Sequence, residues 1–143
     1  MPKSTTFSND LAALIFNATA IANMADNAAG SPLTNLYLSL HTASPGIGGA
    51  QTTNETSYTN YARIAVARSG GGWTVASGAA QNAALAQFPQ CGASGATLTH
   101  VAVGTAASGA GKVLYAGALN ASLAVSNLIQ PQFSAGALTV TES

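Results

Sequence analysis

Beyond residue 33 the chain consists of short runs with strand-like character, and this pattern constrains the fold most. In the first run, Leu36, Leu38 and Leu40 occupy every second position, which is the pattern of a half-buried strand. Further strand-like runs follow at 61–68, 73–76, 83–88, 98–104, 113–118, 122–126 and 137–141, most of them separated by Gly, Pro, Ser or Asn. Because no helical segments alternate with them, we predict a mainly β fold, an antiparallel β-sandwich or jelly roll, and not a parallel α/β sheet.

A helical period precedes these strands. Apolar residues recur three or four positions apart from Leu11 to Ala25, which places them on one helix face. Ser8 or Asn9 can cap the start of such a helix, and Gly30 and then Pro32 end it. The pattern predicts one N-terminal α-helix.

These patterns predict a single domain over residues 1–143. Within it we expect an N-terminal arm over 1–7, the helix over 8–30 and the β-sandwich over 33–143. The continuous apolar run 11–16 is too short for the core of a signal peptide or for a membrane span. We therefore expect no association with a membrane.

The scarcity of charge is the second constraint. Four basic and four acidic residues make up 6% of the chain, against about 25% in an ordinary soluble domain. No basic surplus exists to neutralise phosphates, so we expect no nucleic-acid partner. Because protein interfaces are depleted in Lys, Glu and Asp, we infer that other subunits cover much of this surface.

Few side chains are available for catalysis or metal binding. The chain has two histidines, four carboxylates and one cysteine, Cys91, and no Gly-x-Ser-x-Gly motif. The run 108–112 ends in Gly-Lys, but it lacks the first glycine and the hydroxyl residue of a phosphate loop. His41 and His100 lie on predicted strands and are best explained as hydrogen-bonded, half-buried side chains. We therefore expect no enzyme activity, no cofactor and no metal ion.

Three charged residues are the most informative. Arg63 and Arg68 lie five positions apart on one predicted strand, so their side chains point to opposite faces. One of them therefore points toward the inner layer or toward a neighbouring subunit. Glu55 is the nearest acid in the sequence and can pair with either arginine. An ordinary surface ion pair and an interface contact both remain open.

Several motifs in order resemble a family of small virion proteins of tailed bacteriophages. The first is the run 36–46, Leu-Tyr-Leu-Ser-Leu-His-Thr-Ala-Ser-Pro-Gly, and the second is Glu55-x-x-Tyr58-x-x-Tyr61-Ala62-Arg63. Gly72-Trp73, the segments 82–89 and 99–104, and Phe133-x-Ala-Gly136-Ala-Leu138 continue the set. The resemblance covers nearly the whole chain from the helix onward and implies a phage virion protein without catalytic residues.

Proteins of this kind are often named tail-fibre proteins, and similar small β-proteins act as capsid cement or decoration proteins. From this resemblance and the low charge we expect a cement protein on the outer capsid surface. Its partners would be the major capsid protein and copies of itself, in a dimer or trimer. The residues expected to contact partners are those of segment 2–7, the loop 46–53 and the two arginines: Pro2, Lys3, Phe7, Arg63 and Arg68.

The alternative is a tail-fibre or tail-tip component that takes part in binding a host receptor. Clustered aromatic side chains are typical of receptor-binding loops, and Tyr58, Tyr61 and Trp73 are the candidates here. The same three residues are equally well explained by packing in the core.

Overall fold

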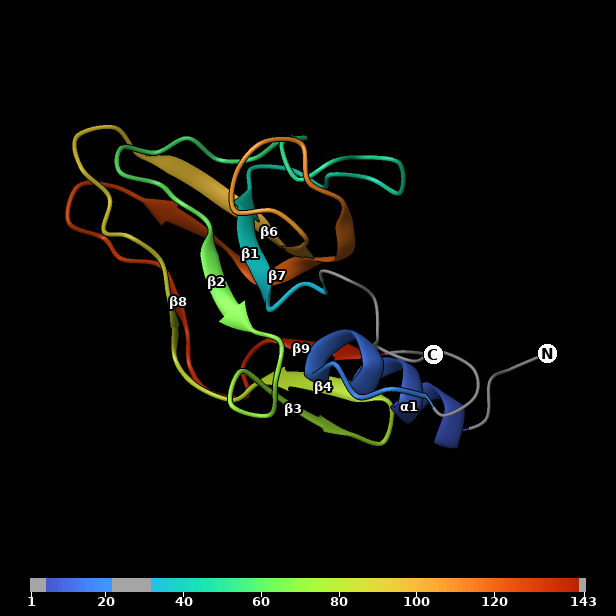
Figure 1. Ribbon diagram of the computed structural model, residues 1–143. Coiled ribbons are helices and arrows are strands. Elements are labelled where there is room, and N and C mark those ends of the chain that lie inside the picture. Colours follow the sequence, from blue (N-terminus) through green and yellow to red (C-terminus); the bar gives the residue numbers. More distant parts are fainter. Residues whose placement is uncertain (1–4, 22–31, 142–143) are drawn as a thin grey trace. The chain divides into compact units, whose positions relative to one another are not determined.

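The computed structural model describes residues 5–21 and 32–141 (Figure 1). These residues form one α-helix and nine β-strands, and the strands make sheets of four, three and two strands. The pairs β1–β6, β6–β7, β3–β4 and β4–β9 are antiparallel. The predicted mainly β fold with one N-terminal helix is confirmed for this part of the chain.

The chain divides into two compact units, and each is described by itself. Unit 1 comprises residues 1–35, 66–86 and 133–143, and unit 2 comprises 36–65 and 87–132. Neither unit is a continuous stretch of sequence, because the chain passes from one to the other after residues 35, 65, 86 and 132. The single domain and its sandwich or jelly-roll arrangement stay predictions.

Unit 1 packs a helix on a small sheet. Helix α1 (Thr5–Asn17) lies against β3 (Trp73–Ala76) and β4 (Ala79–Asn82), and β9 (Thr139–Thr141) completes the sheet in the order β3-β4-β9. Buried side chains of Phe16 and Trp73 meet with their ring centroids 4.6 Å apart. This aromatic contact is the centre of the core of unit 1.

The helix differs from the prediction at both ends. It begins at Thr5, so residues 5–7 are helical and not part of an arm. Ser8 and Asn9 are not the expected N-caps, because both lie inside the helix; the Asn9 side chain accepts a hydrogen bond from the backbone N–H of Gly78 in the β3–β4 turn (3.4 Å). The helix ends at Asn17, since Ala18 takes a left-handed conformation (φ 54°) that stops helical hydrogen bonding. The predicted continuation over 22–30 lies outside the described residues.

A tight hairpin in unit 1 contains a strand that the sequence did not reveal. β3 and β4 pair from Trp73↔Asn82 to Ala76↔Ala79, so only Ser77 and Gly78 form the loop. Both have positive φ values (51° and 75°), as a type I′ hairpin turn requires. Strand β4 has the sequence Ala-Ala-Gln-Asn, whose low β propensity hid it from the pattern.

A four-stranded sheet in the order β2-β1-β6-β7 lies mainly in unit 2. Its strands are β1 (Asn35–His41), β2 (Ile64–Ala67), β6 (Ala96–Gly104) and β7 (Val113–Val125). The three leucines of β1 are buried as predicted, with at most 1% of their surface exposed, but Ser39 and His41 on the opposite face are also fully buried. Strand β1 is therefore covered on both faces.

One long strand stands where two were predicted. β7 runs from Val113 to Val125 and continues across the gap between the two predicted strands. The register with β6 shifts there, because Leu98 pairs with Leu123 whereas His100 pairs with Ala118. The intervening residues 119–122 lie opposite a single residue of β6. The two remaining strands, β5 (Ala86–Gln87) and β8 (Gln132–Phe133), form the two-stranded sheet. β8 was not predicted, because two residues carry no periodicity.

Candidate functional site

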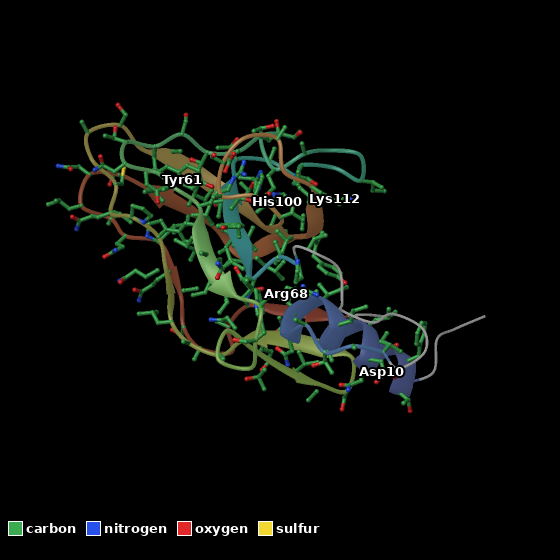
Figure 2. All side chains as sticks on the ribbon, in the orientation of Figure 1. Asp10, Tyr61, Arg68, His100 and Lys112 are labelled. Atoms are coloured by element: carbon green, nitrogen blue, oxygen red, sulfur yellow. The ribbon has the colours of Figure 1, made fainter. Side chains whose placement is uncertain are left out.

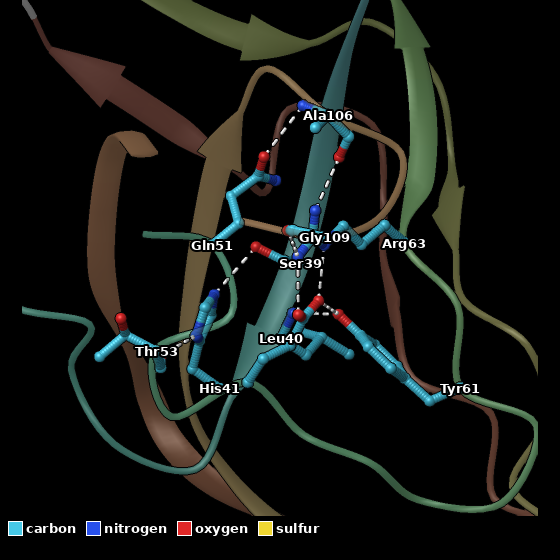
Figure 3. A network of polar contacts seen from close by, with 10 residues as sticks. Ser39, Leu40, His41, Gln51, Thr53, Tyr61, Arg63, Ala106 and Gly109 are labelled. Carbon is cyan, nitrogen blue, oxygen red and sulfur yellow. Dashed lines mark hydrogen bonds and ion pairs between the residues drawn. The ribbon is translucent and has the colours of Figure 1, made fainter. Parts of the chain in front are cut away.

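An ion pair organises the polar interior of unit 2. The guanidinium group of Arg63 donates from Nε to Glu55 Oε1 (2.6 Å) and from Nη2 to Glu55 Oε2 (2.7 Å) (Figure 3). The side chains of Arg63 and Glu55 are only 3% and 14% exposed. These hydrogen bonds raise the pKa of Arg63 above its ordinary value. A bidentate pair with so little exposure is held in one geometry.

The same carboxylate is linked to the backbone of β1 through Tyr61. The Tyr61 hydroxyl donates to Glu55 Oε1 (2.8 Å) and accepts from the backbone N–H of Leu40 (3.1 Å). Burial raises the pKa of Tyr61, and the neighbouring carboxylate acts in the same direction. Tyr61 therefore serves as a neutral bridge between the ion pair and the centre of the sheet.

Arg63 also fixes the loop between β6 and β7. Its Nη1 donates to the carbonyl of Ala106 (2.9 Å) and its Nη2 to the carbonyl of Gly109 (2.8 Å) (Figure 3). The buried side chain of Gln51 accepts from the backbone N–H of Ala106 (2.9 Å). A Cβ atom at Gly111 would lie 2.2 Å from Gln51 Oε1, so this position requires glycine. The run 108–112, which resembles a phosphate loop, is thus held by side chains from the interior of the unit, and it leads into a strand.

Ser39 and His41 form a buried pair on β1. His41 Nδ1 lies 3.0 Å from the carbonyl oxygen of Thr53 and therefore carries the proton, while Nε2 accepts from the Ser39 hydroxyl (2.9 Å). Burial lowers the pKa of His41, although the hydrogen bond to Thr53 opposes the shift. A serine bonded to a histidine can be a nucleophile, but both side chains are fully buried. No substrate can reach this hydroxyl, so the pair is structural.

Two of the three charged side chains of unit 2 pair with each other in its interior. Its sequence contains three charged residues, Glu55, Arg63 and Lys112. The first two neutralise each other, which leaves Lys112 as the one exposed full charge of this unit, at the start of β7 (Figure 2). The surface of unit 2 therefore carries even fewer charges than the composition of the chain indicates.

Arg68 has a different role, in unit 1. Its guanidinium donates to the carbonyls of Leu14 and Ile15, which are in the last turn of α1, and to the carbonyl of Leu33 (3.2 Å) (Figure 2). The last four carbonyls of a helix lack partners within it and carry partial negative charge. Arg68 therefore caps the C-terminal end of α1. The sequence singled out Arg68 but did not indicate this partner.

The structure places the other predicted contact residues as follows. Phe7 lies within α1 and is partly exposed, and Pro2 and Lys3 lie outside the described residues. In the loop 46–53, Ile47 is a fully exposed large apolar side chain between glycines. The guanidinium groups of Arg63 and Arg68 donate hydrogen bonds to residues of their own units. A contact of these five residues with partner subunits stays a prediction.

The aromatic candidates for receptor binding are mostly interior. Trp73 has no exposed surface and Tyr58 is 3% exposed. Tyr61 is more exposed than either and packs edge-on against Tyr58, with the ring centroids 5.3 Å apart. Burial raises the pKa of Tyr58 to about 12. Core packing, the second explanation offered by the sequence, holds for Trp73 and Tyr58. Cys91 is likewise buried.

The part of the chain that sequence reasoning missed is the outer surface of β7. Residues 116–118 and 120–124 are consecutive exposed positions, so neither face of this strand is fully covered. Leu123, Leu128 and Ile129 are exposed by 38%, 67% and 41%. The sequence does contain a hint of this surface, because residues 113–130 carry no charge. The pattern predicted two separate short strands there and did not indicate one long exposed strand.

Neither a metal centre nor a membrane helix is found in the described residues. Within 5–21 and 32–141, no three His, Cys, Asp or Glu side chains lie close enough together to hold a metal ion. None of the helical segments in that part has the length and apolarity to cross a membrane.

Comparison with known families agrees with the resemblance seen in the sequence. The chain matches the family described as Podophage GP4 fiber I protein gp80 over residues 3–141. It therefore belongs to this family, and it is a structural virion protein of a bacteriophage. No curated protein matches the sequence.

Proposed function

We propose that this chain is a subunit of a fibre on a phage tail. The observation that carries the proposal is the family match, which spans residues 3–141 and whose description is that of a podophage fibre protein. The interior supports a structural role, because the Glu55–Arg63 pair ties down loops and does not form an accessible site. This reverses the order of the two locations expected from the sequence.

Capsid cement remains the second candidate, and two observations favour it. The sequence has no internal repeat of fixed period, whereas an extended fibre shaft is commonly built from repeats. The surface of unit 2 carries one full charge, as expected of a tile that neighbours surround. Many such tiles stabilise a shell through binding that is weak for each copy.

Within either location, the loop 46–53 is the described segment that we assign to a neighbouring virion protein. The exposed Ile47 is an apolar side chain that a partner pocket would cover. The loop is anchored, because Asn54 Nδ2 donates to the carbonyl of Ser44 (2.8 Å). Ile47→Ser should lower incorporation into particles severalfold, whereas Leu85→Ser, at another exposed large apolar side chain, should not. Equal incorporation of the two variants would count against this assignment.

Location and copy number test the proposed function together. Purified virions would be labelled with gold-conjugated antibodies against the chain, and its copies would be counted by mass spectrometry against the major capsid protein. Antibody absorbed with purified chain is the control. Gold at the tail and a small copy number support the fibre. Gold over the shell, with copies equal to the capsid subunits or to a simple fraction of them, would establish cement instead.

A further inference from the structure

We propose that the outer edge of β7 is a self-association surface, on which a second copy of this chain adds its own β7 in antiparallel orientation. β7 is the last strand in the order β2-β1-β6-β7, and among the described residues no further strand pairs with its outer side, although an isolated bridge joins Ala50 to Lys112 just before the strand. An unpaired strand edge is a template for another strand. The inference goes beyond the proposed function, since it holds for a fibre and for a shell.

The length and composition of β7 distinguish it from the other sheet edges. The edge strands β2, β3 and β9 have four, four and three residues, whereas β7 has 13. Soluble proteins usually protect their edges with short strands, charges or prolines. The sequence of β7, Val-Leu-Tyr-Ala-Gly-Ala-Leu-Asn-Ala-Ser-Leu-Ala-Val, contains no charge and no proline. It pairs in register with β6 at 115–118 and again at 123–125, and register shifts lie between these two stretches and between Val113 and Tyr115.

Gly117 is an independent sign of a close neighbour. Its φ is not in the left-handed region, and a Cβ atom placed there would meet nothing within 4 Å. Nothing in the described part of the chain therefore requires glycine at this position, and glycine weakens a strand. A glycine within a strand often marks a place where another backbone approaches closely. Ala116 and Ala118 on either side are also small and exposed.

Charge favours a second copy in the antiparallel orientation. Lys112, the one exposed full charge of unit 2, lies directly before β7. A parallel pair would bring the two Lys112 side chains together, and like charges in register are destabilising. An antiparallel pair centred on Ala116 and Gly117 places them at opposite ends. Such a pair has two-fold symmetry, so the same uncharged surface serves both partners.

The test compares two matched glycine substitutions in the purified full chain. Gly117→Lys puts a charge at the centre of the proposed contact. Gly70→Lys makes the same change in a turn of unit 1, where a Cβ atom also has free space and φ is not left-handed. Sedimentation velocity from micromolar to millimolar concentration measures association, and thermal unfolding monitored by circular dichroism verifies the fold. Ala116→Lys is a second variant at the same contact.

We expect a monomer–dimer equilibrium for the wild type and for Gly70→Lys, with association weakened at least tenfold in Gly117→Lys and Ala116→Lys. A wild type that remains monomeric at millimolar concentration would overturn the inference, and so would association that both contact variants retain. Polymers without a defined size would overturn the two-fold arrangement. None of these results depends on where the chain lies in the virion.

Discussion

Strands β1 and β7 belong to one sheet, yet they differ sharply in burial. β1 is covered on both faces, and even its polar residues Ser39 and His41 are buried and hydrogen-bonded. β7 is exposed along most of its length on both faces and is uncharged. The difference shows that unit 2 places its ion pair and its Ser39–His41 pair in the interior, whereas β7 presents an uncharged surface. Such a surface is typical of a protein that functions in an assembly.

The largest expected effect is on the β1 side of this comparison. Arg63→Met removes one partner of the Glu55–Arg63 pair and leaves a nearly buried carboxylate, which costs about 3–5 kcal/mol of the free energy of unfolding. Urea unfolding monitored by fluorescence measures it. The double variant with Glu55→Gln should regain part of the loss, because no unpaired charge remains. A single variant within about 1 kcal/mol of the wild type would contradict the interior role of the pair.

Truncating one leucine on each strand gives the most direct contrast. Leu38→Ala on β1 creates a cavity at a side chain with no exposed surface and should cost about 2–5 kcal/mol. Leu123→Ala on β7, where the side chain is 38% exposed, should cost less than about 1.5 kcal/mol, since only part of its surface leaves water. Equal losses in the two variants would show that β7 is also part of a core.

A smaller effect should follow from pH. Burial lowers the pKa of His41 in the folded state, so the unfolded chain binds a proton more readily. Stability is therefore full above the unfolded pKa of about 6.5 and falls as the pH drops from there through the folded pKa. Urea unfolding between pH 8 and pH 5 should show this loss in the wild type and in His100→Gln. It should disappear in His41→Gln, and a pH dependence that His41→Gln retains would assign it to other groups.

The smallest effect is expected on the exposed face of β7. Ala121→Ser changes an exposed residue in the irregular region of the strand and should alter the free energy of unfolding by no more than about 0.5 kcal/mol. Thermal unfolding by calorimetry is sufficient to measure it. A loss of unfolding free energy above about 1 kcal/mol would mean that Ala121 is buried in the free chain, before any partner binds.

The sequence predicted what depends on local pattern. The alternating leucines of β1 and the run at 73–76 became strands with nearly the predicted bounds. The helix ends earlier than predicted, at Asn17, because Ala18 takes a left-handed conformation, and Arg68, distant in sequence, caps the last turn. β4 was missed because its pairing comes from a two-residue turn and not from its own propensity. The Glu55–Arg63 pairing was one of two alternatives, and the Ala106 and Gly109 carbonyls that also bind Arg63 are too distant in sequence for a local pattern to reveal them.

Hydrogen exchange of the chain in purified virions, compared with the dilute free chain, tests the contrast between β1 and β7 most directly. Exchange would be started in intact particles and measured on peptides by mass spectrometry. The account predicts that β1 is protected in both states, whereas the β7 amides that point away from β6 exchange quickly in the free chain and slowly in the virion. Equally fast exchange of these amides in the particle would contradict the claim that neighbouring subunits cover this edge.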